Sequence, residues 1–442
     1  MSSDVAEKGY LKQFIKGGSS GLLVKGFGLG TKALMQFLLA AWLSAKGYGI
    51  YSYVVTLTFS LSVFGQLGLQ TVVLRFIPTF KSEKNWNKLY GILYIAFRIG
   101  FISGVFLLIG SEYIVWLLRA RLGHTLLISL QVGLLLVPLL VLSGLRQSAL
   151  QSFKSIFKSR FPEMVLIPIT IIIGAGILYV FNIATAINLI YIRIVVVFVG
   201  FLLGMIWLFR EMPFSLRNVT PEYNSKEVIY VALPLLLASS MELILNKTDI
   251  LMLGFLKPME DVGIYNLSLQ MASLTSFGLT SVTLVAAPMI SEYYKKNDIE
   301  NLKNTVSITT WTSTVFSIGA ILVIFFIGNS ILTMIGNEFS TGETALWILI
   351  SGQFLNSITG PVALLLAMTG HQKQFSKVII ISSILNIILN YLFIPVLGIE
   401  GAAVATMIST ILWNIWMSYD VWKFLNLKPS ILTRPSLSSL KL

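Results

Sequence analysis

Residues 20–43, SGLLVKGFGLGTKALMQFLLAAWL, form a segment long enough and apolar enough to span a bilayer, which takes about 20 residues. It nevertheless carries Lys25 and Lys32, which lie two helical turns apart and share a helix face with Gln36. A lysine near the bilayer centre costs about 3 kcal/mol on insertion scales, so such a stripe is not expected to face lipid. We therefore expect this helix to face a water-filled cavity or a structural partner on another helix.

The composition of the whole chain is that of a membrane protein. Of its 442 residues, 55% are hydrophobic and only 12% are charged, whereas soluble domains carry about 25% charged residues. Long apolar runs interrupted by Gly and Pro predict helices, since a β-barrel would show alternating segments of about ten residues. Cysteine is absent, so no disulfide framework or thiolate metal site is expected. The first residues lack the apolar core of a signal peptide, and the first membrane helix is expected to serve for targeting.

Hydropathy predicts twelve membrane-spanning helices. An even number places both termini on the same side of the membrane. The predicted spans cover residues 20–44, 49–76, 88–114, 124–146, 161–181, 184–209, 227–254, 262–290, 303–328, 343–368, 375–396 and 401–422.

Lysine and arginine in the connecting segments set the orientation, because cytoplasmic loops carry an excess of both. With the N-terminus in the cytoplasm, the outer loops hold only Lys46, Arg119, Arg121 and Lys257. The inner segments hold most of the others, including Arg146 at the end of the fourth span. The net charge of +13 is therefore assigned mainly to cytoplasmic loops and not to nucleic-acid binding. We expect a multi-pass protein of the cell membrane with both termini in the cytoplasm.

The spans fall into two sets of six, separated by the longest inner loop. The tripeptide GIY recurs at residues 49–51 and 263–265, and the loops KSEKNWNKL and KKNDIENLK share the same offset. These matches predict two pseudo-symmetric six-helix bundles with a site between them. The predicted division is a cytoplasmic N-terminal segment 1–19, an N-terminal lobe 20–210, a cytoplasmic linker 211–226, a C-terminal lobe 227–422 and a cytoplasmic tail 423–442.

In this repeat register Lys32 corresponds to Asn246 in the seventh span. Glu242 and Asp249 share a helix face with Asn246, and Lys247 lies beside that face, where it could pair with a carboxylate or reach the cavity edge. Glu242 fits a proton or sodium site as well as it fits a structural partner for a lysine. Because Asp249 lies near the outer end of its span, we expect it at a solvated helix end.

The remaining polar residues within spans have two interpretations each. Lys32 lies about 18 Å into its helix and is the main candidate for substrate binding, whereas Lys25 fits a cavity or an interface anchor equally well. Arg98 and Arg193 reach mid-depth, where they line the cavity or pair with other helices; Arg75 better fits an interface anchor.

Ser382, Asn386 and Asn390 share one face of the eleventh span and either bond neighbouring helices or, like Gln36, line the cavity.

Catalytic signals are absent or poor. The two histidines, His124 and His371, fall on opposite sides of the predicted membrane and cannot form a metal pair. There is no GxxxxGK[ST] motif, which excludes an ATP-driven pump of that type. The predicted loops are too short for an active-site domain, so we expect no enzyme and no catalytic or metal-binding residues.

Three segments resemble a known family of membrane transporters. NIILNYLFIPVLGIEGAAVAT (386–406) is similar to the penultimate-to-last helices of oligosaccharide flippases, AKGYGIYSYVVTLTFSLSVFGQLGLQTVVLRF (45–76) to their second helix, and DILMLGFLKPMEDVGIYNLSLQ (249–270) to their seventh-to-eighth junction. The family is the polysaccharide transporter (Wzx-type) branch of the multidrug/oligosaccharidyl-lipid/polysaccharide (MOP, MATE-like) exporter superfamily.

The resemblance implies two six-helix lobes around a V-shaped, alternately opening cavity. It also implies a polyprenyl phosphate- or pyrophosphate-linked oligosaccharide as substrate, with glycan polymerase or glycosyltransferase machinery as a partner. Family members hold the lipid phosphate with cationic residues of the first two helices, here Lys25, Lys32 and Arg75. We expect Arg98 and Arg193 to support that phosphate. Glu242, Asn246, Lys247 and Asp249 are expected to couple transport to H⁺ or Na⁺ or to line the cavity, with no other cofactor.

The alternative is a cation-coupled small-molecule or multidrug antiporter on the same fold. The multidrug branch tends to place an acid in the first helix, where this chain has lysines.

Overall fold

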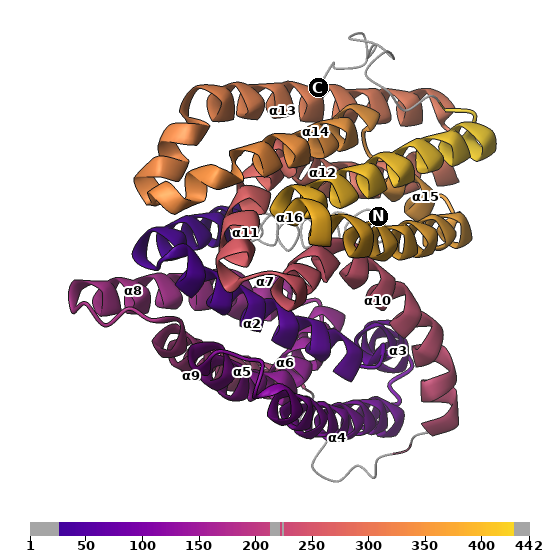
Figure 1. The fold of residues 1–442 in the computed structure, drawn as a ribbon. Helices are drawn as coiled ribbons and strands as arrows, with labels where there is room; N and C mark the ends of the chain where they lie inside the picture. Colours follow the sequence, from indigo (N-terminus) through magenta and orange to yellow (C-terminus); the bar gives the residue numbers. More distant parts are fainter. Residues whose placement is uncertain (1–25, 213–221, 223–224, 428–442) are drawn as a thin grey trace. The chain divides into compact units, whose positions relative to one another are not determined.

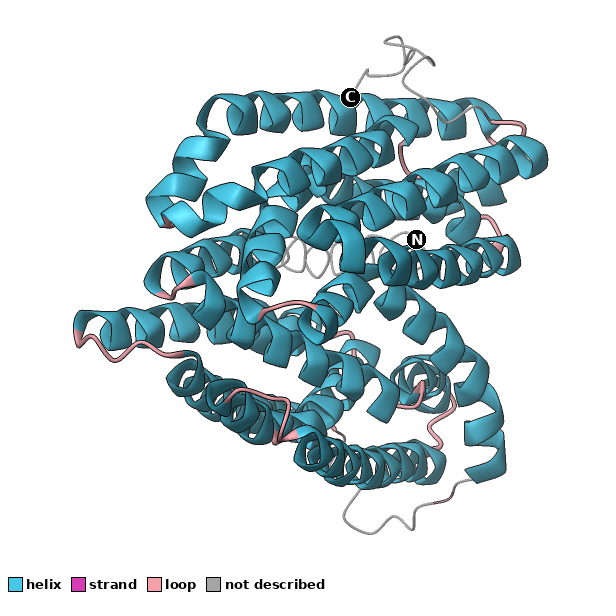
Figure 2. Ribbon diagram, viewed as in Figure 1, coloured by secondary structure: helices cyan, strands magenta, loops and turns pink. Residues whose placement is uncertain are grey.

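The computed structural model describes residues 26–212, 222 and 225–427, with the side chains of residues 225–242 described only in part. Helices dominate this part of the chain (Figure 1), and Figure 2 shows that turns and short loops make up the rest. No strand occurs among the described residues, so the predicted all-α class is confirmed.

The first half of the chain begins with a helix over residues 26–42. The elements that follow are α2 (Ala45–Gly65), α3 (Leu69–Ser82), α4 (Trp86–Leu118), α5 (His124–Leu134), α6 (Leu136–Ser152), α7 (Ile156–Phe161), the π-helix η1 (Pro162–Leu166), α8 (Ile167–Val180) and α9 (Ala186–Glu211).

The second half begins with the long helix α10 (Ser225–Leu256). It continues with α11 (Met259–Ser273), the 3₁₀-helix η3 (Leu274–Ser276), α12 (Phe277–Lys295), α13 (Ile299–Ile335), the 3₁₀-helix η4 (Asn337–Gly342), α14 (Glu343–Thr359), α15 (Val362–Met368) and α16 (Gln372–Leu425).

The predicted spans lie on these helices. Within the described residues, eight helical segments are long and apolar enough to cross a membrane, or nine if the pair 337–359 and 362–368, bent by 47°, counts as one span. The described part of the first helix is short, and α16 counts once although it covers two predicted spans. A multi-pass membrane protein is therefore established, whereas twelve crossings stay a prediction.

By its contacts the described chain divides into two compact units. Unit 1 takes the described residues up to Leu43 and then Ile50–Ser240, and unit 2 takes Ser44–Gly49 and the residues from Met241 onward. The division lies inside α10, whose first half is held in unit 1. There Gly68, with φ 73°, lets the Ala232 carbonyl oxygen approach to 2.2 Å from the point where a Cβ would stand. The lobe limits 20–210 and 227–422 and the linker 211–226 stay predictions.

Each unit has its own apolar core. In unit 1, side chains of α3, α4 and α6 pack together around Ile77, Leu89 and Leu145, all fully buried. In unit 2, side chains of α12, α15 and α16 pack around Ile290 and Leu366.

The start of α2 belongs to unit 2, where it crosses α11 closely at two glycines. A Cβ at Gly49 would lie 1.7 Å from the Met259 carbonyl oxygen, and one at Gly263 would lie 2.1 Å from the Ala45 carbonyl oxygen. These glycines open the two GIY repeats found in the sequence. Small residues of this kind let membrane helices approach backbone to backbone.

The long helix α16 is two antiparallel legs. Gly398 has φ 61° and ψ −128°, which breaks the helix at this point. Asn386, before the break, donates a hydrogen bond of 3.3 Å to the Ser409 hydroxyl after it, so the two legs pack side by side. They coincide with the predicted spans 375–396 and 401–422.

The crossing of α2 and α11 gives a test of the fold. Gly263→Ala should lower the free energy of unfolding by about 1–3 kcal/mol, because its Cβ has no room beside Ala45. Gly319→Ala in α13 is the matched control, since nothing lies within 4 Å of that position. Thermal unfolding of both variants in one detergent measures the difference. Equal melting temperatures would contradict the prediction.

Candidate functional site

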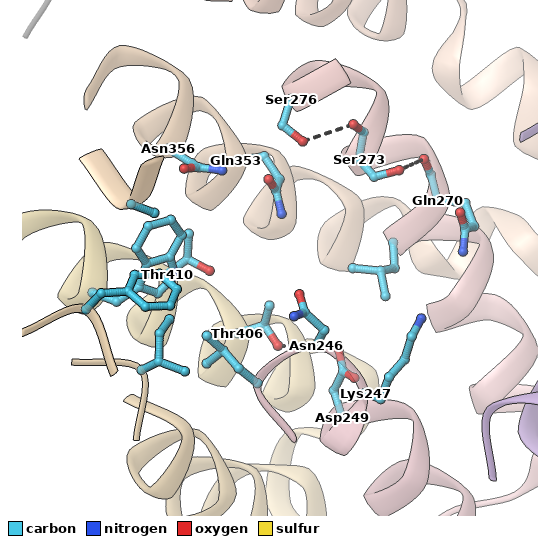
Figure 3. Close-up of a pocket in the computed structure, with 16 residues that line it drawn as sticks. Asn246, Lys247, Asp249, Gln270, Ser273, Ser276, Gln353, Asn356, Thr406 and Thr410 are labelled. Atoms are coloured by element: carbon cyan, nitrogen blue, oxygen red, sulfur yellow. Dashed lines mark hydrogen bonds between the residues drawn. The ribbon is translucent and has the colours of Figure 1, made fainter. Parts of the chain in front are cut away.

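A cavity of about 490 Å³ lies inside unit 2, among α10, α11, α14, α15 and α16 (Figure 3). Ligand pockets usually measure about 300–1,000 Å³, so this one is large enough for a small ligand or part of a larger one. Its wall is polar for a membrane protein. The helix α11 contributes Gln270 and Ser273, α14 contributes Gln353 and Asn356, and α16 contributes Thr406 and Thr410.

Three amides in this wall are available to a ligand. Within the part of the chain that the structure describes, the side chains of Gln270, Gln353 and Asn356 have no hydrogen-bond partner. An amide side chain both donates and accepts hydrogen bonds. Phe375 and Trp413 add aromatic surface to the same cavity. This combination suits a ligand that carries hydroxyl groups on an otherwise apolar ring.

Asp249 forms the charged end of the pocket and is held by three donors. The Tyr265 hydroxyl donates a hydrogen bond of 2.6 Å to Oδ2. The Thr406 hydroxyl donates one of 3.5 Å to the same oxygen (Figure 3). The backbone N–H of Ile250 donates to Oδ1 at 2.8 Å. Asp249 is only 3% exposed. The expectation of a solvated helix end was therefore wrong, because α11 and α16 cover this part of α10.

The other α10 residues predicted for the site lie around Asp249. Lys247 is half-buried, extends into the pocket and interacts electrostatically with the Asp249 carboxylate. Asn246 is exposed on the pocket wall. The side chain of Glu242 lies outside the part of α10 that is described. Two of the predicted side chains thus line one pocket with Asp249.

The first-helix residues belong to unit 1. Lys25 lies outside the described residues, and Lys32 and Gln36 are half-buried on the helix over residues 26–42. Lys32 lies near enough to Glu163 of η1 for an electrostatic attraction.

The three arginines predicted to support a phosphate have separate surroundings. Arg75 on α3 and Arg98 on α4 are exposed, and the Arg75 guanidinium lies 5.8 Å from the centre of the Phe76 ring. Arg193 on α9 is half-buried and donates a hydrogen bond of 3.0 Å to the Tyr51 hydroxyl. Arg193 therefore has an interhelical partner, which was one of its two interpretations.

The predicted polar face of the eleventh span is a packing surface in this structure. Asn386 and Asn390 are buried in the first leg of α16, and Asn390 donates hydrogen bonds to the backbone and side-chain oxygens of Asn386. Neither lines the pocket. Of the two predicted interpretations, the structure agrees with helix packing and not with a cavity wall, because the second leg of α16 covers this face.

One buried ion pair, between Arg146 and Glu163, was not predicted from the sequence. Arg146 was counted with the cytoplasmic loops, but α6 continues to Ser152 and buries this guanidinium completely. It pairs with Glu163 and donates a hydrogen bond of 2.9 Å to the Gly200 carbonyl oxygen. A glutamate inside the predicted span 161–181 was the available signal for a buried cation nearby.

This fold is shared with known transporters of lipids and small molecules. An inward-facing multidrug resistance MATE family transporter of the MOP superfamily superposes with a TM-score of 0.72 at 14% identity, over 89% of this chain and 96% of its own. The lipid II flippase MurJ in an inward closed conformation gives a TM-score of 0.70 at 17% identity, over 90% of this chain and 86% of its own. The chain therefore has the fold found in these two transporters.

Comparison of the sequence with family models identifies the family. The model of the polysaccharide biosynthesis protein family matches residues 14–294, and the MatE model matches residues 234–392. The chain belongs to the polysaccharide biosynthesis protein family. It is also 25% identical over 181 residues to Agl15 of Haloferax volcanii, named as a probable low-salt glycan biosynthesis flippase. That match spans 41% of this chain and 38% of Agl15.

The support of Asp249 by Tyr265 can be measured directly. Tyr265→Phe should lower the free energy of unfolding by about 1–3 kcal/mol, since a buried carboxyl oxygen loses its best donor. Tyr391→Phe on α16 is the control, because that side chain is 66% exposed. Thermal unfolding in detergent compares the two. A loss of stability in the control as large as that in Tyr265→Phe would contradict the assignment.

Proposed function

We propose that this protein is a flippase that moves a polyprenyl phosphate- or pyrophosphate-linked oligosaccharide from the cytoplasmic to the outer leaflet of the cell membrane. The product would serve surface polysaccharide or glycan synthesis by glycosyltransferase or polymerase partners. Membership of the polysaccharide biosynthesis protein family supports this function, as does the transporter fold. The proposed topology keeps both termini in the cytoplasm.

The observation that carries the proposal is the polar wall of the unit 2 pocket. The amides of Gln270, Gln353 and Asn356, with the threonine hydroxyls and aromatic rings, match the hydrogen-bonding hydroxyls and apolar ring faces of a sugar. The charges of Lys247 and Asp249 offset each other there. A pocket with balanced charge suits a neutral, hydroxyl-rich group better than an organic cation.

The lipid phosphate is assigned to the cationic residues of unit 1. Lys32 is the central residue, because it is a half-buried ammonium in a membrane helix, and ammonium and guanidinium groups bind phosphate well. Lys25, Arg75, Arg98 and Arg193 are proposed to support it.

Ion coupling is assigned to the α10 end of the pocket. Asp249 presents a carboxyl group with the Thr406 hydroxyl beside it, a set of oxygen atoms that suits H⁺ or Na⁺. Glu242, Asn246 and Lys247 complete the proposed coupling region.

A cation-coupled drug antiporter is the second candidate. The MatE match over residues 234–392, which includes Asp249, favours it. Export of a cationic dye from vesicles, with no effect on surface glycans when the gene is deleted, would support this alternative and contradict the flippase.

The phosphate assignment predicts the behaviour of a Lys32 variant. Lys32→Gln should reduce glycan export about tenfold or more, since a hydrogen bond to a charged group contributes about 1.5–3 kcal/mol. Lys296→Gln, at an exposed position after α12, is the matched control. Export is measured by glycan staining of cells that contain equal amounts of each variant in the membrane. Normal export by Lys32→Gln would remove Lys32 from the site.

The coupling assignment predicts a different defect for Asp249. Asp249→Asn should leave binding of the lipid-linked glycan intact but make flipping in proteoliposomes independent of an imposed H⁺ or Na⁺ gradient. The isosteric amide keeps an oxygen for Tyr265 while removing the titratable, cation-binding group. Flipping is followed by access of an external glycosidase to the glycan. An unchanged response to both gradients would contradict the coupling role.

A further inference from the structure

Unit 1 contains a fixed buried charge beside the proposed phosphate site. The Arg146 guanidinium pairs with Glu163 and donates to the Gly200 carbonyl oxygen at 2.9 Å. One turn along α9, a Cβ at Gly204 would lie 1.5 Å from Arg146 Nη1, so the guanidinium fills the space that this glycine leaves. The slot between α6 and α9 therefore immobilises Arg146, and Arg146 immobilises Glu163 Oε1.

Glu163 also lies against the helix that carries Lys32. A Cβ at Gly28 would lie 2.6 Å from the Cβ of Met164, so this helix touches η1 at the residue after Glu163. Lys32 is one turn after Gly28 on the same helix face, and its ammonium attracts the Glu163 carboxylate. The second carboxylate oxygen, Oε2, is buried and has no hydrogen-bond partner among the described residues.

We propose that Glu163 is a positioning residue that competes with the substrate phosphate for Lys32. It attracts the lysine ammonium while the phosphate site is empty and yields it when a phosphate arrives. This inference rests on the proposed function, which makes Lys32 the phosphate ligand.

The charges around Glu163 explain why a phosphate can displace it. The carboxylate is shared with Arg146, and Arg160 adds further positive charge nearby. Its net pull on Lys32 is therefore weaker than that of an unshared anion. Because Glu163 is anchored to Arg146, it also cannot follow the lysine toward the ligand. The arrangement orients Lys32 without neutralising it permanently, which favours release of the phosphate after transport.

A purely structural ion pair makes a different prediction. If Glu163 served only to neutralise Arg146, its loss would weaken folding and all activities together, with no dependence on Lys32. A double-mutant cycle between Glu163 and Lys32 separates the two roles.

The test uses the purified full chain in detergent, with geranylgeranyl monophosphate as the probe and calorimetry as the readout. Glu163→Gln should tighten probe binding about tenfold, within the range of coupling between neighbouring groups. In a Lys32→Gln background, the same substitution should change nothing. Glu163→Asp keeps the negative charge and should stay near the wild-type affinity. In proteoliposomes, Glu163→Gln should lower both KM and kcat for flipping, since a more tightly held phosphate leaves more slowly.

Glu163→Gln leaves a buried guanidinium with a weaker partner, so a second variant guards against misfolding. The double substitution Arg146→Met with Glu163→Met removes the whole pair, a replacement that buried ion pairs often tolerate. It should also tighten probe binding, because the competing anion is gone. Unchanged or weaker binding in a folded variant overturns the proposal, and so does a tightening that persists without Lys32.

The outcomes also separate this inference from the proposed function. Wild-type binding of the probe by Lys32→Gln would overturn Lys32 as the phosphate ligand. Lost binding in Lys32→Gln together with unchanged binding in Glu163→Gln would overturn only the role of Glu163.

Discussion

A guanidinium buried among membrane helices has to be satisfied by neighbouring helices, because lipid offers no hydrogen bonds. Arg146 imposes that requirement on unit 1. It draws α6 and α9 together at Gly200 and Gly204, a pair with the small-xxx-small spacing that permits close helix approach. It also sets the place of Glu163, which the π-helix at Pro162–Leu166 presents to Arg146. Such π-turns are rare and frequently occur at functional sites.

Unit 2 also has a buried charged group whose hydrogen bonds come from neighbouring helices, but this group faces a cavity. Asp249 is satisfied by Tyr265, Thr406 and its own helix backbone, but it stands at the wall of a cavity and not in a closed slot. Arg146 is enclosed by glycines and inaccessible to a ligand, whereas Asp249 shares its pocket with Lys247 and several amide side chains. Arg146 holds neighbouring helices together, whereas Asp249 lies where a ligand or ion can reach it.

Hydropathy was sufficient to locate the helices, because a segment that crosses lipid must be apolar over its whole length. It could not locate partners that meet only after folding. Asp249 and Thr406 are far apart in the sequence, so nothing local predicted that α16 would bury the carboxylate. Arg146 was misassigned because α6 extends beyond its apolar stretch. Asn386 and Asn390 were correctly placed on one helix face, but which element covers that face depends on the break at Gly398. Gln353 and Asn356 carried no signal, since single amides are common in any helix.

The distribution of charged side chains in unit 1 and in the unit 2 pocket indicates which class of substrate fits the proposed function. The described cations of unit 1 include Lys32, Arg98 and Arg193, while the unit 2 pocket holds one cation, one anion and several neutral polar groups within the residues that the structure describes. A simple organic cation would find no excess of negative charge in that pocket, and a free phosphate would make no use of its amides and aromatic rings. A lipid-linked sugar has an anionic phosphate and a neutral, hydroxyl-rich head in one molecule. It is therefore the substrate class that makes use of both proposed sites, and in that proposal Glu163 keeps the phosphate from being bound too tightly for release.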